Sequence, residues 1–395
     1  MKKHVKNNVN WVGKVDWELK HFHGNEYSTH KGSTYNSYLV QEEKTVLIDT
    51  VWAPFADEFV ANLAKEVDLK KIDYIIANHG EVDHSGSLPA LMKLIPDTPI
   101  YCTANAVKSL KGQYHQDWNF KVVKTGDSID IGNGKKLVFV EMMMLHWPDS
   151  MATYLTGDNI LFSNDAFGQH LATENLFNDQ VDQCELFQES IKYFANILTP
   201  FNVQLRKKLD EVIAMNLPIE MIATSHGVIW RDNPAQIIGK YIEWSKDYQE
   251  NQISIFYDTM WNGTKQVAER IAEGIALADP AVVVKIFNIS RSDANDLITE
   301  VFKSKTVLIG SPTVSNTMLQ SVASLTHMIK QMKFKGKKAA AFGCYGWSGE
   351  AVKVINETMQ GAGFEIISEG LKTSWNPDTD AQKAAVEFGK TVAKL

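Results

Sequence analysis

The chain has 395 residues, of which 44% are hydrophobic and 22% are charged, a composition typical of globular proteins. Because hydrophobic cores stop growing at about 250–300 residues, this length predicts at least two domains. A net charge of -7 argues against nucleic-acid binding, and no apolar run of about 18 residues predicts a membrane span. Cys102, Cys184 and Cys344 form no CxxC pair, which excludes a four-thiolate iron site and favours a cytoplasmic location.

Strands and helices follow one another irregularly in the first 250 residues. Two strands are predicted around residues 42–44, followed by an amphipathic helix near 59–67 and a buried strand at 73–77. Ser85 or Ser87 is expected to cap the next helix. Hairpin turns are predicted at Asn133-Gly134 and at 157–159. Helices are then expected at 185–198, 204–215 and 234–248, with a strand at 221–224 before the last of them.

Four of these predicted strands end at residues that can bind metal. The strand at 73–77 leads into the segment 78–84, which alone holds four possible ligands. The complete set is His79, Glu81, Asp83, His84, His146, Asp165 and His226. A lone histidine is more often structural, and two of the carboxylates could be helix caps. Repetition at four strand ends nevertheless argues for a metal site.

The number and type of these ligands indicate the metal. One tetrahedral zinc needs four ligands, so seven imply a dinuclear site with a bridging carboxylate. The spacing H-x-E-x-D-H resembles the H-x-H-x-D-H signature of the metallo-β-lactamase fold, with Glu81 in place of a histidine. An anionic oxygen donor favours a harder, redox-active metal such as iron. A zinc hydrolase remains the principal alternative.

Strands and helices alternate beyond the polar stretch 249–252, which predicts a parallel, doubly wound sheet. We therefore expect domains at 1–250 and 251–395. Three strand-end loops there carry hydroxyl, glycine and aromatic residues suited to a phosphate and a planar ring, as in an FMN site. The predicted FMN-binding residues are Thr259, Met260, Trp261, Asn262, Gly263, Thr264, Ser311, Pro312, Thr313, Asn316, Cys344, Tyr345, Gly346, Trp347, Ser348 and Gly349.

Over essentially its whole length the chain resembles the A-type flavodiiron proteins. The likeness is carried by the ligand pattern, the flavin loops, and segments such as Trp11-Val12-Gly13, Phe22-His23-Gly24 and 225–231, which are most similar to the core of the flavorubredoxin branch. That resemblance implies an N-terminal metallo-β-lactamase-like αββα sandwich and a C-terminal flavodoxin-like sheet. No cysteine pairs for a rubredoxin domain are present. We expect either a separate rubredoxin donor or a shortened chain.

The resemblance also implies how the ligands divide between two non-haem irons. One iron takes His79, Glu81 and His146, and the other takes Asp83, His84 and His226, with Asp165 bridging them. A head-to-tail homodimer, or a dimer of such dimers, is expected, with the flavin of one subunit facing the irons of the other. Electron transfer requires that proximity.

The function predicted from this resemblance is reduction of a diatomic gas. Electrons pass from rubredoxin through FMN to the diiron centre, which reduces NO to N2O or O2 to water. His23, His170 and Tyr193 are possible proton donors or pocket groups near the ligand segments. Two other interpretations stay open: a zinc-dependent hydrolase fused to a flavodoxin module, and an electron carrier with a degenerate metal domain.

Overall fold

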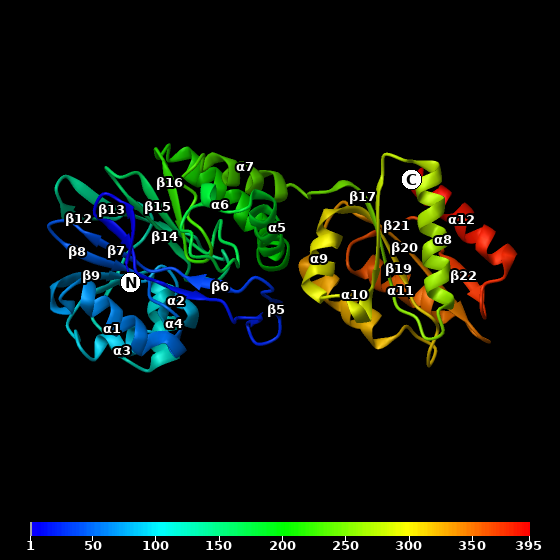
Figure 1. Ribbon diagram of the computed structural model, residues 1–395, viewed down its shortest axis with the longest axis horizontal. Helices are drawn as coiled ribbons and strands as arrows, with labels where there is room; N and C mark the ends of the chain where they lie inside the picture. Colours follow the sequence, from blue (N-terminus) through cyan, green and yellow to red (C-terminus); the bar gives the residue numbers. More distant parts are fainter. Residues whose placement is uncertain (1) are drawn as a thin grey trace. The chain divides into compact units, whose positions relative to one another are not determined.

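The computed structural model describes residues 2–395, which form two compact units (Figure 1). One unit runs up to Phe194 and resumes at Phe201–Ser245, and the other contains Ala195–Pro200 and Lys246–Leu395. The domain extents 1–250 and 251–395 stay a prediction. Across residues 2–395, no helix has the length and apolar character needed to cross a bilayer.

Two sheets form the middle layers of the first unit. The first has the order β1-β2-β7-β8-β9-β10-β11 and the second the order β12-β13-β14-β15-β16. The first sheet contains β1 (Lys3–Lys6), β2 (Val9–Trp11), β7 (Tyr38–Gln41), β8 (Thr45–Ile48), β9 (Ile72–Ile76), β10 (Ile100–Cys102) and β11 (Phe120–Val122). The second contains β12 (Ser128–Gly132), β13 (Lys135–Glu141), β14 (Met151–Leu155), β15 (Ile160–Asn164) and β16 (Met221–Thr224). Two short pairs lie outside them: β3 (Lys14–Asp16) with β6 (Ser33–Tyr35), and β4 (His21–Phe22) with β5 (Tyr27–Ser28).

The two sheets pack on each other and are covered by helices on their outer faces. Val46 and Ile76 of the first sheet share one buried apolar cluster with Phe139 and Phe162 of the second. Beneath the first sheet lie α1 (Ala56–Glu66), α2 (Val82–Ser85), α3 (Leu88–Met92) and α4 (Ala104–Tyr114) (Figure 1). The second sheet carries α5 (Gln183–Tyr193), α6 (Asn202–Ala214) and α7 (Ala235–Trp244) (Figure 1). This αββα sandwich confirms the predicted N-terminal fold.

Of the two serines expected to cap the helix after the ligand segment, Ser87 occupies the N-cap position of α3, but neither hydroxyl makes a capping hydrogen bond. Ser85 lies inside α2, and its hydroxyl donates to the carbonyls of Gly80 and Glu81 at 3.0 and 2.8 Å. Ser87 precedes α3 without a capping bond, because its hydroxyl donates to Val51 O at 2.8 Å. Both hydroxyls therefore hold the ligand loop and its neighbour in place.

The second unit is a parallel sheet with helices on both faces. Its strand order is β18-β17-β19-β20-β21, with β22 also beside β20, and every pairing is parallel. The strands are β17 (Glu250–Tyr257), β18 (Val283–Asn288), β19 (Ser304–Gly310), β20 (Lys338–Tyr345), β21 (Glu365–Ile366) and β22 (Leu371–Ser374). The helices are α8 (Gly263–Ala278), α9 (Ala294–Lys303), α10 (Gln320–Met332), α11 (Glu350–Gly361) and α12 (Thr379–Ala393). This 2-1-3-4-5 order is that of flavodoxin, as predicted.

One buried lysine joins the amino-terminal ends of the strands, at the opposite end of the sheet from the loops predicted to bind flavin. The side chain of Lys337 is 3% exposed and donates to three backbone carbonyls, those of Tyr248, Phe302 and Ser304, at 2.9, 2.6 and 2.8 Å. Three acceptors match the three N–H donors of an ammonium group. The contact fixes the start of β17 against the start of β19.

Replacing Lys337 by methionine should destabilise the second unit by at least about 2 kcal/mol, because each buried carbonyl left without a donor costs about 1–3 kcal/mol. The free energy of unfolding is measured by chemical denaturation, with release of the flavin predicted for this unit as the signal. Lys335→Met, at an exposed position two residues away, is the matched control and should unfold like the wild type. Equal midpoints for the two variants would contradict the assignment.

Candidate metal centre and flavin site

The ligand segment of the first unit is anchored by both sheets. Asn78, which follows β9 closely, donates its backbone and side-chain N–H groups to the two oxygens of Asp49 at 2.8 and 3.0 Å. From β14 of the second sheet, Met151 N donates to Asn78 O and Thr153 Oγ1 donates to Asn78 Oδ1, at 2.8 and 2.7 Å. Asn78 thus links the two sheets at the point where the ligands begin.

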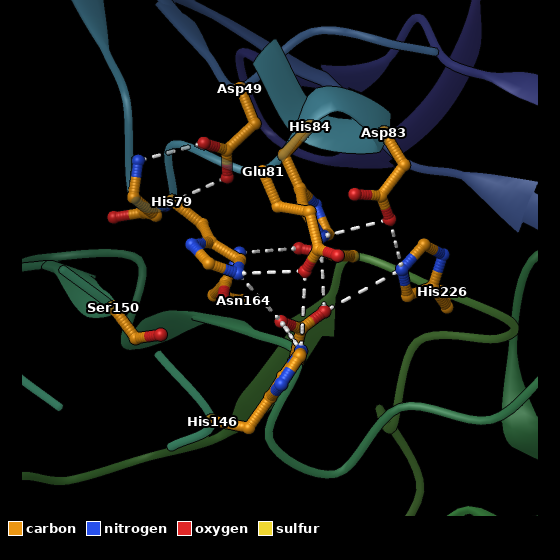
Figure 2. A network of polar contacts seen from close by, with 12 residues as sticks. Asp49, His79, Glu81, Asp83, His84, His146, Ser150, Asn164 and His226 are labelled. Carbon is orange, nitrogen blue, oxygen red and sulfur yellow. Dashed lines mark hydrogen bonds and ion pairs between the residues drawn. The ribbon is translucent and has the colours of Figure 1, made fainter. Parts of the chain in front are cut away.

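The seven predicted ligands follow β9, β13, β15 and β16 and converge in space. Figure 2 labels six of them, all except Asp165. In one group, Glu81 Oε2 lies 3.2 Å from His79 Nε2 and 3.3 Å from His146 Nε2. In the other, Asp83 Oδ2 lies 3.1 Å from His84 Nε2 and 3.0 Å from His226 Nε2. His84 therefore points into the site like the other imidazoles.

Asp165 lies between the two groups. Its Oδ2 is 3.6 Å from the Nε2 atoms of both His79 and His146. Its Oδ1 is 3.1 Å from His84 Nε2 and 3.5 Å from His226 Nε2. One carboxylate oxygen faces each group, which is the arrangement that a carboxylate bridge between two metals requires.

Burial and charge at this cluster fit a pair of cations. Asp83 and Asp165 are 3% and 1% exposed, and the nitrogen atoms beside their oxygens belong to the candidate histidine ligands themselves. Burial alone would raise the pKa of Asp165, but the imidazole of His84 holds it well below its usual range. Hydrogen bonds from His146, His23 and His79 likewise outweigh burial and lower the pKa of Glu81. Several carboxylates buried together require a counter-charge, and mixed carboxylate and imidazole ligands suit iron.

The three predicted pocket groups lie beside the cluster. His23 Nε2 is 2.9 Å from Glu81 Oε1, the oxygen turned away from the other imidazoles. The ring of His170 packs 5.0 Å from that of His226 and 5.3 Å from that of Tyr193. Its Nδ1 lies 2.7 Å from Ser33 Oγ, while its buried Nε2 has no hydrogen-bond partner within the described part of the chain. Burial and the nearby His226 lower the pKa of His170 well below its usual value.

A pocket of about 820 Å³ opens at the carboxyl ends of the strands in the second unit. Most of the predicted flavin residues line it: Thr259, Met260, Trp261, Gly263, Thr264, Pro312, Thr313, Asn316, Cys344, Tyr345, Gly346, Trp347 and Ser348. Three predicted residues do not line it. Asn262 precedes α8 with a positive φ of 64°, Gly349 precedes α11, and Ser311 Oγ donates to Pro312 O at 2.8 Å. These three residues belong to the loops around the pocket but are not part of its lining.

The chemistry of the pocket fits a phosphate-bearing planar cofactor. At the N-terminus of α8, Thr264 is 1% exposed and its hydroxyl has no partner within the described chain, so a phosphate there would gain a donor and a helix dipole. Trp261 and Trp347 are 86% and 89% exposed, and such open indoles can contact a flavin ring.

The sequence interpretation missed Ser315, Trp375 and Asn376, which also line the pocket. Trp375 directly follows β22, and its ring centroid lies 6.4 Å from that of Trp347. Its backbone N–H donates to Tyr345 O at 2.6 Å, which fixes this loop to the end of β20. In the sequence, a tryptophan three residues before a predicted aspartate helix cap could have indicated a fourth loop at the pocket.

Comparison with known proteins agrees with both folds. The family model for the ODP family beta lactamase matches residues 34–227, and the flavodoxin model matches residues 255–389. The chain is 58% identical to the anaerobic nitric oxide reductase flavorubredoxin of Escherichia coli K12 over 391 residues, covering 99% of this chain and 81% of that protein.

Two solved structures share the fold along the whole chain. The rubredoxin oxygen:oxidoreductase of Desulfovibrio gigas is 34% identical with a TM-score of 0.95, covering 100% of this chain and 98% of that one. The flavodiiron protein of Giardia intestinalis is 33% identical with a TM-score of 0.95, covering 100% and 96%.

The chain therefore belongs to the flavodiiron protein family. It is an oxidoreductase whose two cofactors are a non-haem diiron centre and FMN. Its closeness to flavorubredoxin confirms the branch that the sequence motifs indicated.

Changing Asp165 to alanine should remove the side chain that faces both ligand groups. We expect bound iron to fall from about two per chain to less than about one, while FMN stays bound because it lies in the other unit. Metal analysis and flavin absorbance measure both. Asp210→Ala, an exposed aspartate on α6, should keep both cofactors. Loss of FMN together with iron would contradict independent sites.

Changing Trp375 to alanine should weaken FMN binding about tenfold, since an aromatic contact contributes about 0.5–1.5 kcal/mol beyond its buried area. Quenching of flavin fluorescence during titration of the flavin-free protein gives the affinity. Trp17, a 54% exposed tryptophan of the first unit, provides the control variant Trp17→Ala. An unchanged FMN affinity in Trp375→Ala would rule out contact between this ring and the flavin.

Proposed function

We propose that the protein is a nitric oxide reductase that converts two NO molecules and two electrons to N2O and water. The observation that carries this proposal is the position of Asp165, which faces two histidines of one ligand group with one oxygen and two histidines of the other group with the other oxygen. Two metals held side by side can bind two diatomic molecules close together. The 58% identical relative, named an anaerobic nitric oxide reductase flavorubredoxin, supports the same substrate.

We propose that each of the two spatial groups of ligands holds one iron. His79, Glu81 and His146 would hold one iron, Asp83, His84 and His226 the other, and Asp165 would bridge them. The position of His84 Nε2, 3.1 Å from both Asp83 and Asp165, supports the inclusion of His84 in this set. When bound, the two irons would bind the gas and provide the electrons that reduce it.

The surrounding side chains can supply protons and orientation for this reaction. His23 Nε2 donates to Glu81 Oε1 at 2.9 Å and so restrains the free oxygen of that ligand. His170 is held by Ser33 through Nδ1, and because burial lowers its pKa it stays neutral, so its Nε2 can orient a substrate beside Tyr193 rather than donate a proton. N2O formation consumes two protons, so a buried donor beside the reacting gas is needed.

O2 is the second candidate substrate, because the Desulfovibrio gigas relative is named a rubredoxin oxygen:oxidoreductase. Rubredoxin, or a rubredoxin-like protein, is the proposed electron donor to FMN. A head-to-tail homodimer, or a dimer of such dimers, is the proposed assembly in which flavin and irons of different subunits meet. The zinc hydrolase alternative is not favoured, because Glu81 replaces the second histidine of its signature.

The test is gas consumption by the protein loaded with iron and FMN and supplied with reduced rubredoxin. We expect anaerobic NO consumption with one N2O formed per about two NO, and a slower or comparable uptake of O2 in separate runs. Removal of iron by a chelator should abolish NO uptake while FMN remains reducible. Full cofactor occupancy without uptake of either gas would contradict the proposed function.

A further inference from the structure

Asp149 is a fully buried carboxylate that touches one of the metal-ligand histidines. It is 0% exposed and lies in the loop between β13 and β14, three residues after His146. Its Oδ1 lies 2.8 Å from His79 Nδ1, and its Oδ2 accepts a hydrogen bond from Gly80 N at 3.1 Å.

The surrounding chain is built so that this carboxylate can approach the ligand segment. A Cβ on Gly80 would lie 2.6 Å from Asp149 Oδ2 and 2.7 Å from Ser109 Cβ, so only glycine fits there. Thr103 Oγ1 donates to Asp149 O at 3.0 Å, which fixes the backbone at the same point. Side chain and backbone of Asp149 are both held in one position.

The contact determines how His79 can bind metal. Its Nε2 faces Glu81 and Asp165 at 3.2 and 3.6 Å, so when Nε2 binds a metal the ring proton lies on Nδ1. Nδ1–H then donates to the Asp149 carboxylate. A carboxylate in this position orients a histidine ligand and makes it a stronger electron donor.

The second ligand group has a different support. His226 Nδ1 lies 2.7 Å from the backbone carbonyl of Thr34, a neutral acceptor. A neutral carbonyl accepts a weaker hydrogen bond from the ring N–H than a carboxylate does. The two halves of the site therefore differ in the charge behind one histidine each.

We propose that Asp149 is a positioning residue of the diiron centre, which fixes the ring and tautomer of His79 and makes the iron held by His79, Glu81 and His146 the more electron-rich of the two. The proposal rests on the ligand assignment of the proposed function and is independent of which gas is reduced. Greater electron donation stabilises the oxidised state of that iron.

The test compares Asp149→Asn with Asp158→Asn in the full-length protein loaded with iron and FMN. Asparagine keeps the size of Asp149 and one acceptor oxygen but removes the charge. Asp158, which is 1% exposed and pairs with Lys135 at 2.8 Å, is the control for loss of a buried carboxylate away from the ligands. Ferrous affinity is measured by competition with a chelator, and the diiron and flavin potentials are measured by redox titration.

For Asp149→Asn we expect iron affinity to fall about 10- to 100-fold and the potential of the diiron centre to become more positive, with the flavin potential unchanged. In ⁵⁷Fe Mössbauer spectra, one of the two iron signals should shift more than the other. Asp158→Asn should match the wild type in iron affinity, in the diiron potential and in the Mössbauer spectra. Wild-type affinity and potential in Asp149→Asn, or lost stability with an unchanged potential, would overturn the proposal. Wild-type protein with full iron that consumes neither gas would instead refute only the proposed function.

Discussion

Three buried carboxylates set the central constraint of this protein. Glu81, Asp83 and Asp165 are removed from water among imidazoles, and none can stay ionised there without positive charge nearby. Much of the first unit serves this cluster: strand ends from both sheets supply the ligands, and Asn78 joins the sheets directly beside them. A cation pair in the site would therefore stabilise the sandwich as well as supply its chemistry.

The second unit uses the opposite electrostatic arrangement. Its pocket is formed by backbone loops, hydroxyl groups and the N-terminus of α8, a combination that attracts an anionic phosphate. Open indoles at Trp261 and Trp347 offer contact to a planar ring without adding charge. An anionic, metal-binding site and an anion-binding flavin site thus coexist in one chain because each belongs to a separate compact unit.

The convergence of the candidate metal ligands could be predicted from the sequence because these residues follow neighbouring strands, whose ends lie close together in the fold. The parallel fold of the second unit was equally accessible, since alternating strands and helices allow few topologies. Trp375 was missed because β22 is four residues long and lacks an apolar alternation. The roles of Ser85, Ser87 and Asp149 depend on partners that are distant in the chain, and no local pattern identifies such partners.

The central claim is that the carboxylate cluster holds a redox-active metal pair that works together with a flavin. An anaerobic reductive titration of the purified protein tests this claim most directly. Iron-loaded protein should accept about four electron equivalents per chain, two in the flavin and two in the metal pair, whereas zinc-loaded protein should accept about two. An uptake of about two equivalents in both forms would contradict the account.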